Sequence, residues 1–179
     1  MKRLILLAPA SSAPLLLSPA ITTAGATAGG WQIPGASREA TVEAIHEQGG
    51  IAVAAHPLWR TERQAGRFPH GVGERLGAGR FDAVEVLNGA YTPSMVRANA
   101  EAVRANESLG LAAIGGSDAH VKQAVGWAHT LFPGSTAADL RVAILSHATA
   151  VEGRHLSLIG LSRYLAWGVE RLRIRPAIA

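Results

Sequence analysis

Three short, predominantly apolar segments constrain this chain more than any other feature of its sequence. They span residues 51–55, 82–87 and 111–114, and each stops at polar or glycine residues. Apolar runs of this length are typical of parallel strands that are covered on both faces. Helical sequence lies between them, so the pattern predicts an α/β sheet or barrel with a site at the carboxyl ends of its strands.

Local signals place the remaining elements. Ser37 is a suitable N-cap for a helix over about residues 38–48, and Gly110 is a suitable end for a longer helix over about 93–109. Downstream, the sequence predicts a strand within residues 125–132, a helix over about 137–146 that Ser135 or Thr136 caps, a last strand within 151–160 and an amphipathic helix over 161–174.

The composition favours one packed domain. The chain has 179 residues, of which 48% are hydrophobic and 17% are charged, and these values exclude a disordered polymer. It has no cysteine, so thiolate metal ligands are excluded and His, Asp and Glu remain as candidates. The net charge of +4 favours anionic partners such as phosphate or nucleic acid, although an arginine-rich solvated face explains the same surplus.

Asp118 and His120 form an Asp-x-His pair shortly after the third apolar segment. Residues two apart share a face where the backbone is extended, so this carboxylate and this imidazole can point at the same place. Oxygen and nitrogen donors together suit a divalent metal, whereas the alternative interpretation is a polar loop with a capping aspartate. His56 follows the first apolar segment, just before Pro57, and strengthens the metal hypothesis.

The first thirty residues differ from the rest of the chain. A short positive start precedes an apolar stretch broken by prolines, and a tract of small residues follows. This order is typical of a secretory signal peptide, and a non-native start is the alternative interpretation. The apolar stretch is too short and too broken for a transmembrane helix. We therefore divide the chain into a signal-like or non-native segment, 1–30, and a domain, 31–179.

The apolar segments and their polar ends carry a family resemblance. Gly-Gly-Ile-Ala-Val-Ala-Ala-His-Pro, Phe-Asp-Ala-Val-Glu-Val-Leu-Asn-Gly and Gly-Gly-Ser-Asp-Ala-His follow one another in this order. Together they resemble the polymerase-and-histidinol-phosphatase (PHP) family of metal-dependent phosphoesterases, over about residues 35–147. The resemblance implies a distorted (β/α)7 barrel with parallel strands, divalent ions at the strand ends and hydrolysis of phosphate esters, in some members on nucleotides or nucleic acid.

By position in these motifs, the resemblance implies that His56, Asp118 and His120 are metal ligands and that Asn88 lines the substrate pocket. The metal is manganese, zinc or magnesium, and its identity stays open. Glu85 lies in the second apolar segment, where it can bind a cation or pair with an arginine. The family's usual location predicts a cytoplasmic protein, with secretion as the alternative if residues 1–30 are a signal peptide.

The sequence departs from the family before His56. The family's early His-x-His motif and its further acidic and His ligands have no counterpart there, so the expected fold is a partial barrel whose N-terminal half is missing. Two hypotheses follow from this departure. The chain is either the C-terminal portion of a metal-dependent phosphoesterase, or a truncated, catalytically incompetent PHP fragment that acts at most as a metal- or anion-binding module.

Overall fold

The structure, a computed structural model, describes residues 21–24, 37–60, 71–90 and 92–153, and isolated helical positions between 162 and 170. Its elements, in chain order, are β1 (Ile21–Ala24), α1 (Arg38–Glu47), β2 (Ile51–Ala54), the 3₁₀ helix η2 (Gly73–Leu76), β3 (Ala83–Asn88), α2 (Pro93–Leu109), β4 (Ala112–Gly116), the 3₁₀ helix η3 (Lys122–Ala124), β5 (Ala128–Leu131), α3 (Ala137–Leu145) and β6 (Ala150–Gly153).

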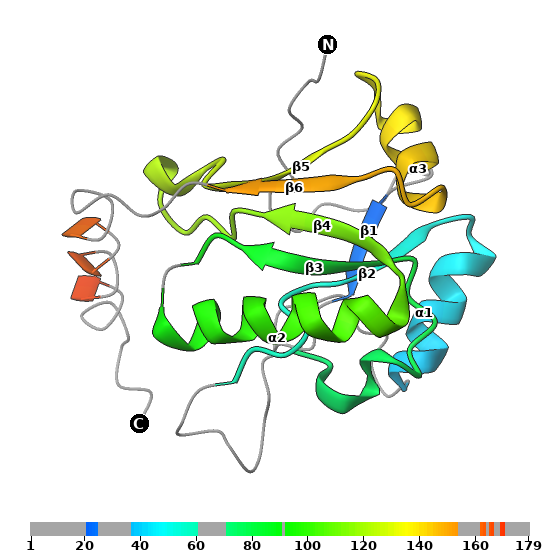
Figure 1. Ribbon diagram of the computed structural model, residues 1–179, viewed down its shortest axis with the longest axis horizontal. Coiled ribbons are helices and arrows are strands. Elements are labelled where there is room, and N and C mark those ends of the chain that lie inside the picture. The colour runs from blue at the N-terminus through cyan, green and yellow to red at the C-terminus, as the bar shows by residue number, and fades with distance from the viewer. Residues whose placement is uncertain are drawn as a thin grey trace, which may run out of the picture.

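Four parallel strands form one sheet in the order β1-β2-β3-β4, and β5 and β6 form an antiparallel pair. The pair continues the layer beyond β4, while α2 runs along the sheet below β3 (Figure 1). The predicted α/β class with parallel strands is confirmed. Among the described residues the sheet is open and no barrel closes, so the predicted partial (β/α)7 barrel is not confirmed.

Both faces of the sheet are buried, as the apolar segments predicted. On one face, Ile51, Val53 and Ile114 pack against the Leu140 and Ile144 side chains of α3. The other face carries a second apolar cluster, to which α1, η2 and α2 contribute. Its fully buried members are Val42, Ala52, Ala54, Val72, Leu76, Phe81, Val84 and Val86. Adjacent residues of a strand point to opposite faces, and this alternation divides each strand between the two clusters.

The helices begin and end where their local signals predicted. Ser37 caps α1 by accepting from the amide of Ala40. Thr136 caps α3, and Asp139 completes a capping box with it. Gly110 ends α2 in the left-handed conformation, with φ of 63°. Such caps satisfy main-chain groups that helix ends leave without intrahelical partners, which is why these boundaries are readable from sequence.

The predicted position of the glycine pair in the third segment is wrong. We expected the strand to stop at residue 114, but Gly115 and Gly116 belong to β4 and pair with Leu87 and Asn88. A Cβ at Gly115 would lie 2.7 Å from the carbonyl oxygen of His129, so the glycine permits β5 to approach β4 closely. Thr130 joins the same two strands, because its hydroxyl bonds both main-chain groups of Gly115.

Parts of several predictions lie outside the described residues. Within segment 1–30, only 21–24 is described, and it pairs in parallel with β2. The predicted strand 151–160 is described to residue 153, where β6 ends, and the predicted helix 161–174 is described only at scattered helical positions. Among the helices that the structure describes, none has the length and apolar character needed to cross a bilayer.

Candidate metal centre

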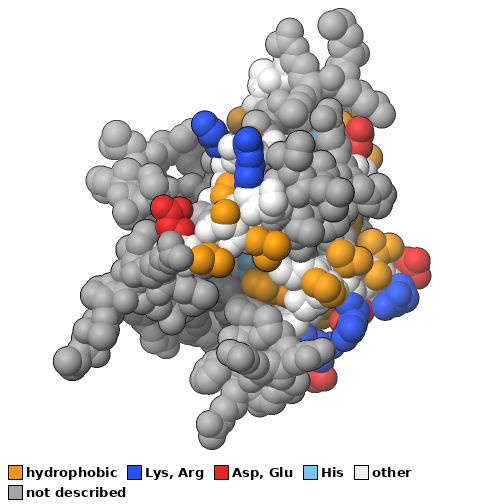
Figure 2. Space-filling model, turned by 90° about the vertical axis from the view of Figure 1, so that its left-hand side faces the viewer, with side chains coloured by type: hydrophobic (Ala, Val, Ile, Leu, Met, Phe, Trp, Pro, Cys, Tyr) orange, Lys and Arg blue, Asp and Glu red, His pale blue; other side chains and the backbone are white. Residues whose placement is uncertain are grey.

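The candidate site lies at the carboxyl edge of the sheet. Asn88 is the last residue of β3, whereas His56 and Asp118 lie two residues beyond the ends of β2 and β4. Figure 2 views the molecule from the side toward which β3 and β4 point in Figure 1, and hydrophobic side chains gather near the middle of that face. Carboxyl ends of parallel strands are the usual place for ligand sites in α/β sheets, because successive strands present their loops together.

Two of the predicted ligands have a left-handed backbone. The φ angle is 28° at His56 and 45° at Asp118, and among the described residues only Arg80 and His147 share this feature without being glycine. An L-residue in this region is strained by its Cβ, by an amount on the order of 1–2 kcal/mol. Such strain persists where surrounding contacts impose it, and it gathers at functional sites.

The carboxylate of Glu85 connects these strand ends. Its Oε2 accepts from the main-chain amide of His56 at 2.6 Å and from Nδ2 of Asn88 at 3.0 Å. Its Oε1 faces Gly116, where a Cβ would lie only 2.5 Å away. Glu85 is 8% exposed, so a buried carboxylate from the middle strand reaches the ends of both neighbouring strands.

An irregularity in β3 makes this arrangement possible. The register between β3 and β4 shifts between Glu85 and Leu87, which inserts one extra residue, Val86. In a regular strand, residues three apart point to opposite faces, whereas a bulge reverses this relation locally. The side chains of Glu85 and Asn88 therefore reach each other, although their sequence spacing alone would separate them.

Both the side chain and the main chain of Asn88 are hydrogen-bonded. Its Oδ1 accepts from the amide of Ala90 at 2.8 Å, and its main chain bonds both ends of the Asn99 amide, at 3.0 and 2.9 Å. With 3% exposure, it fixes the end of β3 against α2. Its predicted contact with substrate stays a prediction, and its observed contacts give it a structural task.

Burial raises the pKa of Glu85 from 4.5 to about 7, because desolvation disfavours the charged form. The negative charge of Asp118 raises it further, whereas the hydrogen bonds from Asn88 and His56 lower it. A buried carboxylate beside a second negative charge is in an environment that favours a proton or a cation.

The residues meet the chemical requirements of a metal site but do not form a complete cage. Nδ1 of His120 lies 2.8 Å from the carbonyl oxygen of Asp118. Such a bond fixes the ring and is typical of metal-binding histidines, whose other nitrogen is the ligand. Imidazole nitrogens suit zinc and carboxylate oxygens suit manganese and magnesium, so the donors do not decide between these metals. However, no three His, Asp or Glu side chains in the described part of the chain lie close enough to hold one ion.

Trp59 lies beside His56, the predicted ligand that follows β2. Its ring meets the His56 ring edge to face, with centroids 5.6 Å apart. Its Nε1 donates to the hydroxyl of Ser94 in the first turn of α2, at 3.1 Å. The loop after β2 is thereby attached to α2, the helix that also holds Asn88 through Asn99.

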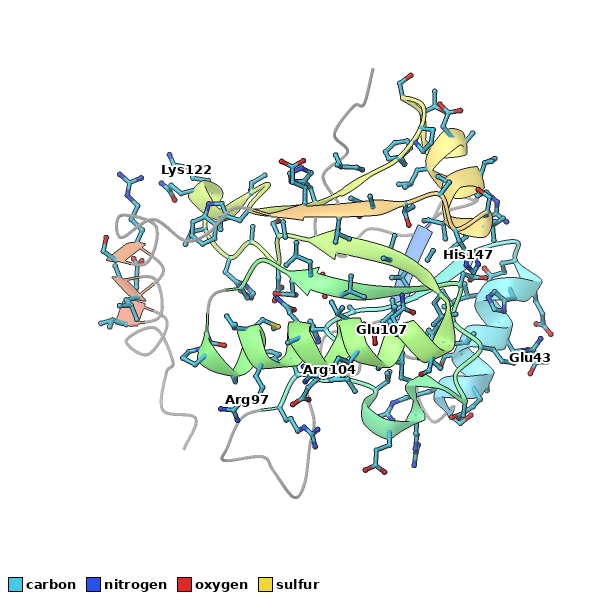
Figure 3. The ribbon with its side chains drawn as sticks, viewed as in Figure 1. Glu43, Arg97, Arg104, Glu107, Lys122 and His147 are labelled. Atoms are coloured by element: carbon cyan, nitrogen blue, oxygen red, sulfur yellow. The ribbon has the colours of Figure 1, made fainter. Side chains whose placement is uncertain are left out.

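The other histidines have different surroundings. His46 of α1 bonds Asp82 at the opposite edge of the sheet, at 2.9 Å. His129 of β5 has Nε2 3.8 Å from the carboxylate of Glu152. His147 follows α3 on the side of the molecule opposite Lys122, which lies just beyond His120 (Figure 3). His70 and His155 lie outside the described residues.

Sequence reasoning left Glu85 undecided and missed Asn99. The signal for Glu85 was a carboxylate in an otherwise apolar strand, where an ionisable group needs partners. The structure gives it main-chain and amide partners and no arginine, among the residues described. Asn99 carried no signal, because an asparagine on a helix surface is ordinary and its partner lies eleven positions away on another element.

Part of the chain is similar to a known protein family. Residues 96–149 match the family PHP_C, described as PHP-associated. The matched segment runs from the first turn of α2 to the start of β6, and it contains Asp118 and His120 but not His56. The match confirms the predicted resemblance to the C-terminal portion of PHP proteins. No curated protein matches the chain.

Proposed function

We propose that this chain is part of a PHP-type metal-dependent phosphoesterase, which hydrolyses phosphomonoesters or the phosphate esters of nucleotides or nucleic acid. The observation that carries the proposal is the meeting of three strand ends at one buried carboxylate. Glu85 bonds the main chain of His56, and its pKa responds to the charge of Asp118. The PHP-associated match over residues 96–149 supports the same conclusion independently.

In this proposal His56, Asp118 and His120 hold a divalent ion, and Asn88 lines the substrate pocket. A bound divalent ion supplies a water of lowered pKa and neutralises charge that develops on the phosphoryl group. The protein residues orient the donors: the Asp118 carbonyl fixes the ring of His120, and Glu85 fixes the main chain of His56. The parallel strands correspond to part of a distorted PHP barrel, and we expect the protein to act in the cytoplasm.

The test measures Mn²⁺ binding by calorimetry and Mn²⁺-dependent hydrolysis of p-nitrophenyl phosphate by the full chain. We expect Asp118→Ala to lower both Mn²⁺ affinity and activity by about 100-fold or more, because it removes a charged donor. Glu107→Ala is the matched control, since Glu107 is an exposed carboxylate on the last turn of α2. Equal Mn²⁺ binding by wild type and Asp118→Ala would show that the ligand assignment is wrong.

One observation favours the second candidate, a catalytically incompetent PHP fragment. The described residues contain no group of three His, Asp or Glu side chains close enough to share an ion. This candidate predicts that wild-type protein has no Mn²⁺-dependent phosphatase activity, even at saturating Mn²⁺. Activity that appears with Mn²⁺ and disappears in Asp118→Ala excludes it.

A further inference from the structure

Glu85 is the buried ionisable side chain at the carboxyl edge to which neither the motifs nor the family match assigns a task. Its surroundings are unusual for a carboxylate. Oε2 receives two donors, and one of them is the main-chain amide of His56 at the short distance of 2.6 Å. Hydrogen bonds to a carboxylate are stronger and shorter than those between neutral groups, so this contact is well suited to impose a local conformation.

The contact fixes the peptide plane through which the chain enters His56, a residue with a left-handed backbone. A histidine with φ of 28° has no intrinsic preference for that geometry over the extended one. The hydrogen bond fixes the plane of the peptide that joins Ala55 to His56, and from this fixed plane the φ of 28° sets the direction in which the Cβ of His56 leaves the main chain. In turning, the chain carries the imidazole to the Trp59 side of the loop, where the two rings meet edge to face.

The surroundings of Glu85 also show that its own position is fixed. Asn88 donates to the same oxygen, and the bulge at Val86 brings that donor within reach. On the other side, Gly116 leaves room for Oε1 where any side chain would collide. Because the Val86 bulge, the Asn88 amide and Gly116 together fix the Glu85 carboxylate, the main chain that binds this carboxylate is fixed as well.

We propose that Glu85 is a positioning residue, whose carboxylate fixes the peptide plane at His56, where the chain makes its left-handed turn, and thereby directs the imidazole to the metal. The inference rests on the proposed function, because it assumes that the His56 ring binds the ion. It assigns Glu85 a task through His56, not a bond to the ion itself. The acceptor oxygen is therefore the essential feature, and the negative charge is secondary.

Two substitutions separate these features. Glu85→Gln keeps an oxygen that can accept from His56 and Asn88, whereas Glu85→Met keeps the length of the side chain and removes the acceptor. Mn²⁺ affinity is measured by calorimetry on the full chain, and the ligand set is read from the visible absorption of bound Co²⁺. Glu107→Met is the matched control for replacing a glutamate by methionine at an exposed position.

We expect Glu85→Met to weaken Mn²⁺ binding by about tenfold or more, as loss of an orienting contact does at other metal sites. Its Co²⁺ spectrum should resemble that of His56→Ala. Glu85→Gln should keep the wild-type Co²⁺ bands and most of the Mn²⁺ affinity. Wild-type affinity in Glu85→Met would overturn the inference, and so would a Glu85→Gln variant as weak as Glu85→Met, because that result makes the charge itself essential.

A second variant decides the matter if Glu85→Met does not fold. Gly116→Ala keeps the glutamate at position 85 but puts a methyl group 2.5 Å from its Oε1. The Glu85 carboxylate must therefore shift away from the position in which it binds His56. We expect the same loss of affinity, and retention of wild-type affinity overturns the inference.

Failure of the proposed function gives a different result: His56→Ala and Asp118→Ala then bind Mn²⁺ as wild type does, and both proposals are wrong. If these two variants lose binding and the Glu85 and Gly116 variants do not, only the positioning task is wrong.

Discussion

The two edges of the sheet each bring a histidine and a carboxylate together, and they use the pair differently. At the amino edge, Oδ2 of Asp82 accepts from the His46 ring at 2.9 Å and from the amide of Ala52 at 2.7 Å. At the carboxyl edge, Oε2 of Glu85 accepts from the main chain of His56, not from its ring. The first pair connects α1 to the sheet, whereas the second sets the direction of an imidazole.

Backbone and burial differ between the edges as well. His46 and Asp82 are partly exposed, at 30% and 20%, and neither residue has a left-handed backbone. At the other edge Glu85 is buried, His56 is left-handed and Asp118 adds a second negative charge nearby. Stability alone does not require strained residues or a buried carboxylate beside a like charge, so the carboxyl edge has the properties of a site that gives up stability for function.

The largest expected effect concerns the pH dependence that Glu85 brings to the metal-free protein. Its pKa is about 7 in the folded state, compared with an ordinary value of 4.5. Between these values the folded protein retains a proton that the unfolded chain releases, so the contribution to stability is complete at low pH and is lost as the pH rises toward 7. Ionising the buried carboxyl group thus lowers the unfolding free energy by about 3 kcal/mol, at 1.36 kcal/mol for each unit by which its pKa is raised.

Wild type should therefore lose unfolding free energy relative to Glu85→Gln as the pH rises from 5 to 8, by up to about 3 kcal/mol. Urea unfolding of chelator-treated protein at both pH values measures this difference. The two proteins differ only at residue 85, so the difference between their profiles isolates Glu85. Parallel pH profiles for the two proteins would contradict the buried environment that the structure gives Glu85.

A smaller effect is expected at the amino edge. Asp82→Ala removes the acceptor of the His46 ring and of the Ala52 amide, and Ala52 is fully buried. Leaving a buried amide without its partner should lower the unfolding free energy by about 2 kcal/mol. Mn²⁺ affinity should change by less than about twofold, because the site lies at the other edge. A large loss of Mn²⁺ binding with unchanged stability would remove the distinction between the edges.

The smallest expected effect is a gain in stability at a left-handed residue outside the site. His147 has φ of 56° and follows α3, where the amide of Ala148 bonds the carbonyl of Ala143 as in a Schellman end. Glycine adopts this conformation without strain, so His147→Gly should raise the unfolding free energy by about 1 kcal/mol. Thermal unfolding measures the gain, and Mn²⁺ affinity should not change.

His56→Gly makes the corresponding change at the carboxyl edge. It relieves the same kind of backbone strain, but it also removes the imidazole, so we expect it to lose Mn²⁺ binding. Normal Mn²⁺ affinity in His56→Gly would place His56 in the same class as His147, a strained residue without a role in binding. The two glycine variants thus separate strain that serves a helix end from strain that serves a site.

Elements with local signals could be predicted from the sequence. The helix over 93–109 was predicted at its observed bounds, because a proline near its start and Gly110 at its end determine them within a short stretch of chain. The carboxyl edge was also predictable in outline. Apolar segments that stop at His56 and shortly before Asp118 indicate strands, and parallel strands bring their ends together.

What could not be predicted depends on contacts between distant segments. The bulge at Val86 has no distinctive local sequence, yet it decides that Glu85 and Asn88 lie side by side. The place of Gly116 inside β4 likewise follows from its pairing with Asn88, and its lack of a side chain leaves room for the Glu85 carboxylate. Alternation along a regular strand would have separated Glu85 from Asn88, so sequence reasoning could name the edge but not the contacts within it.

X-ray absorption of the Zn²⁺-loaded full chain tests the central claim most directly, because it counts the imidazoles bound to the ion. The proposed site predicts two, His56 and His120, with Zn–N distances of about 2.0–2.1 Å. His56→Ala and His120→Ala should each lose one imidazole, whereas His147→Gly should keep both. An ion with no imidazole ligand, or a count that stays the same in His56→Ala and His120→Ala, would contradict a metal site at the carboxyl edge of this sheet.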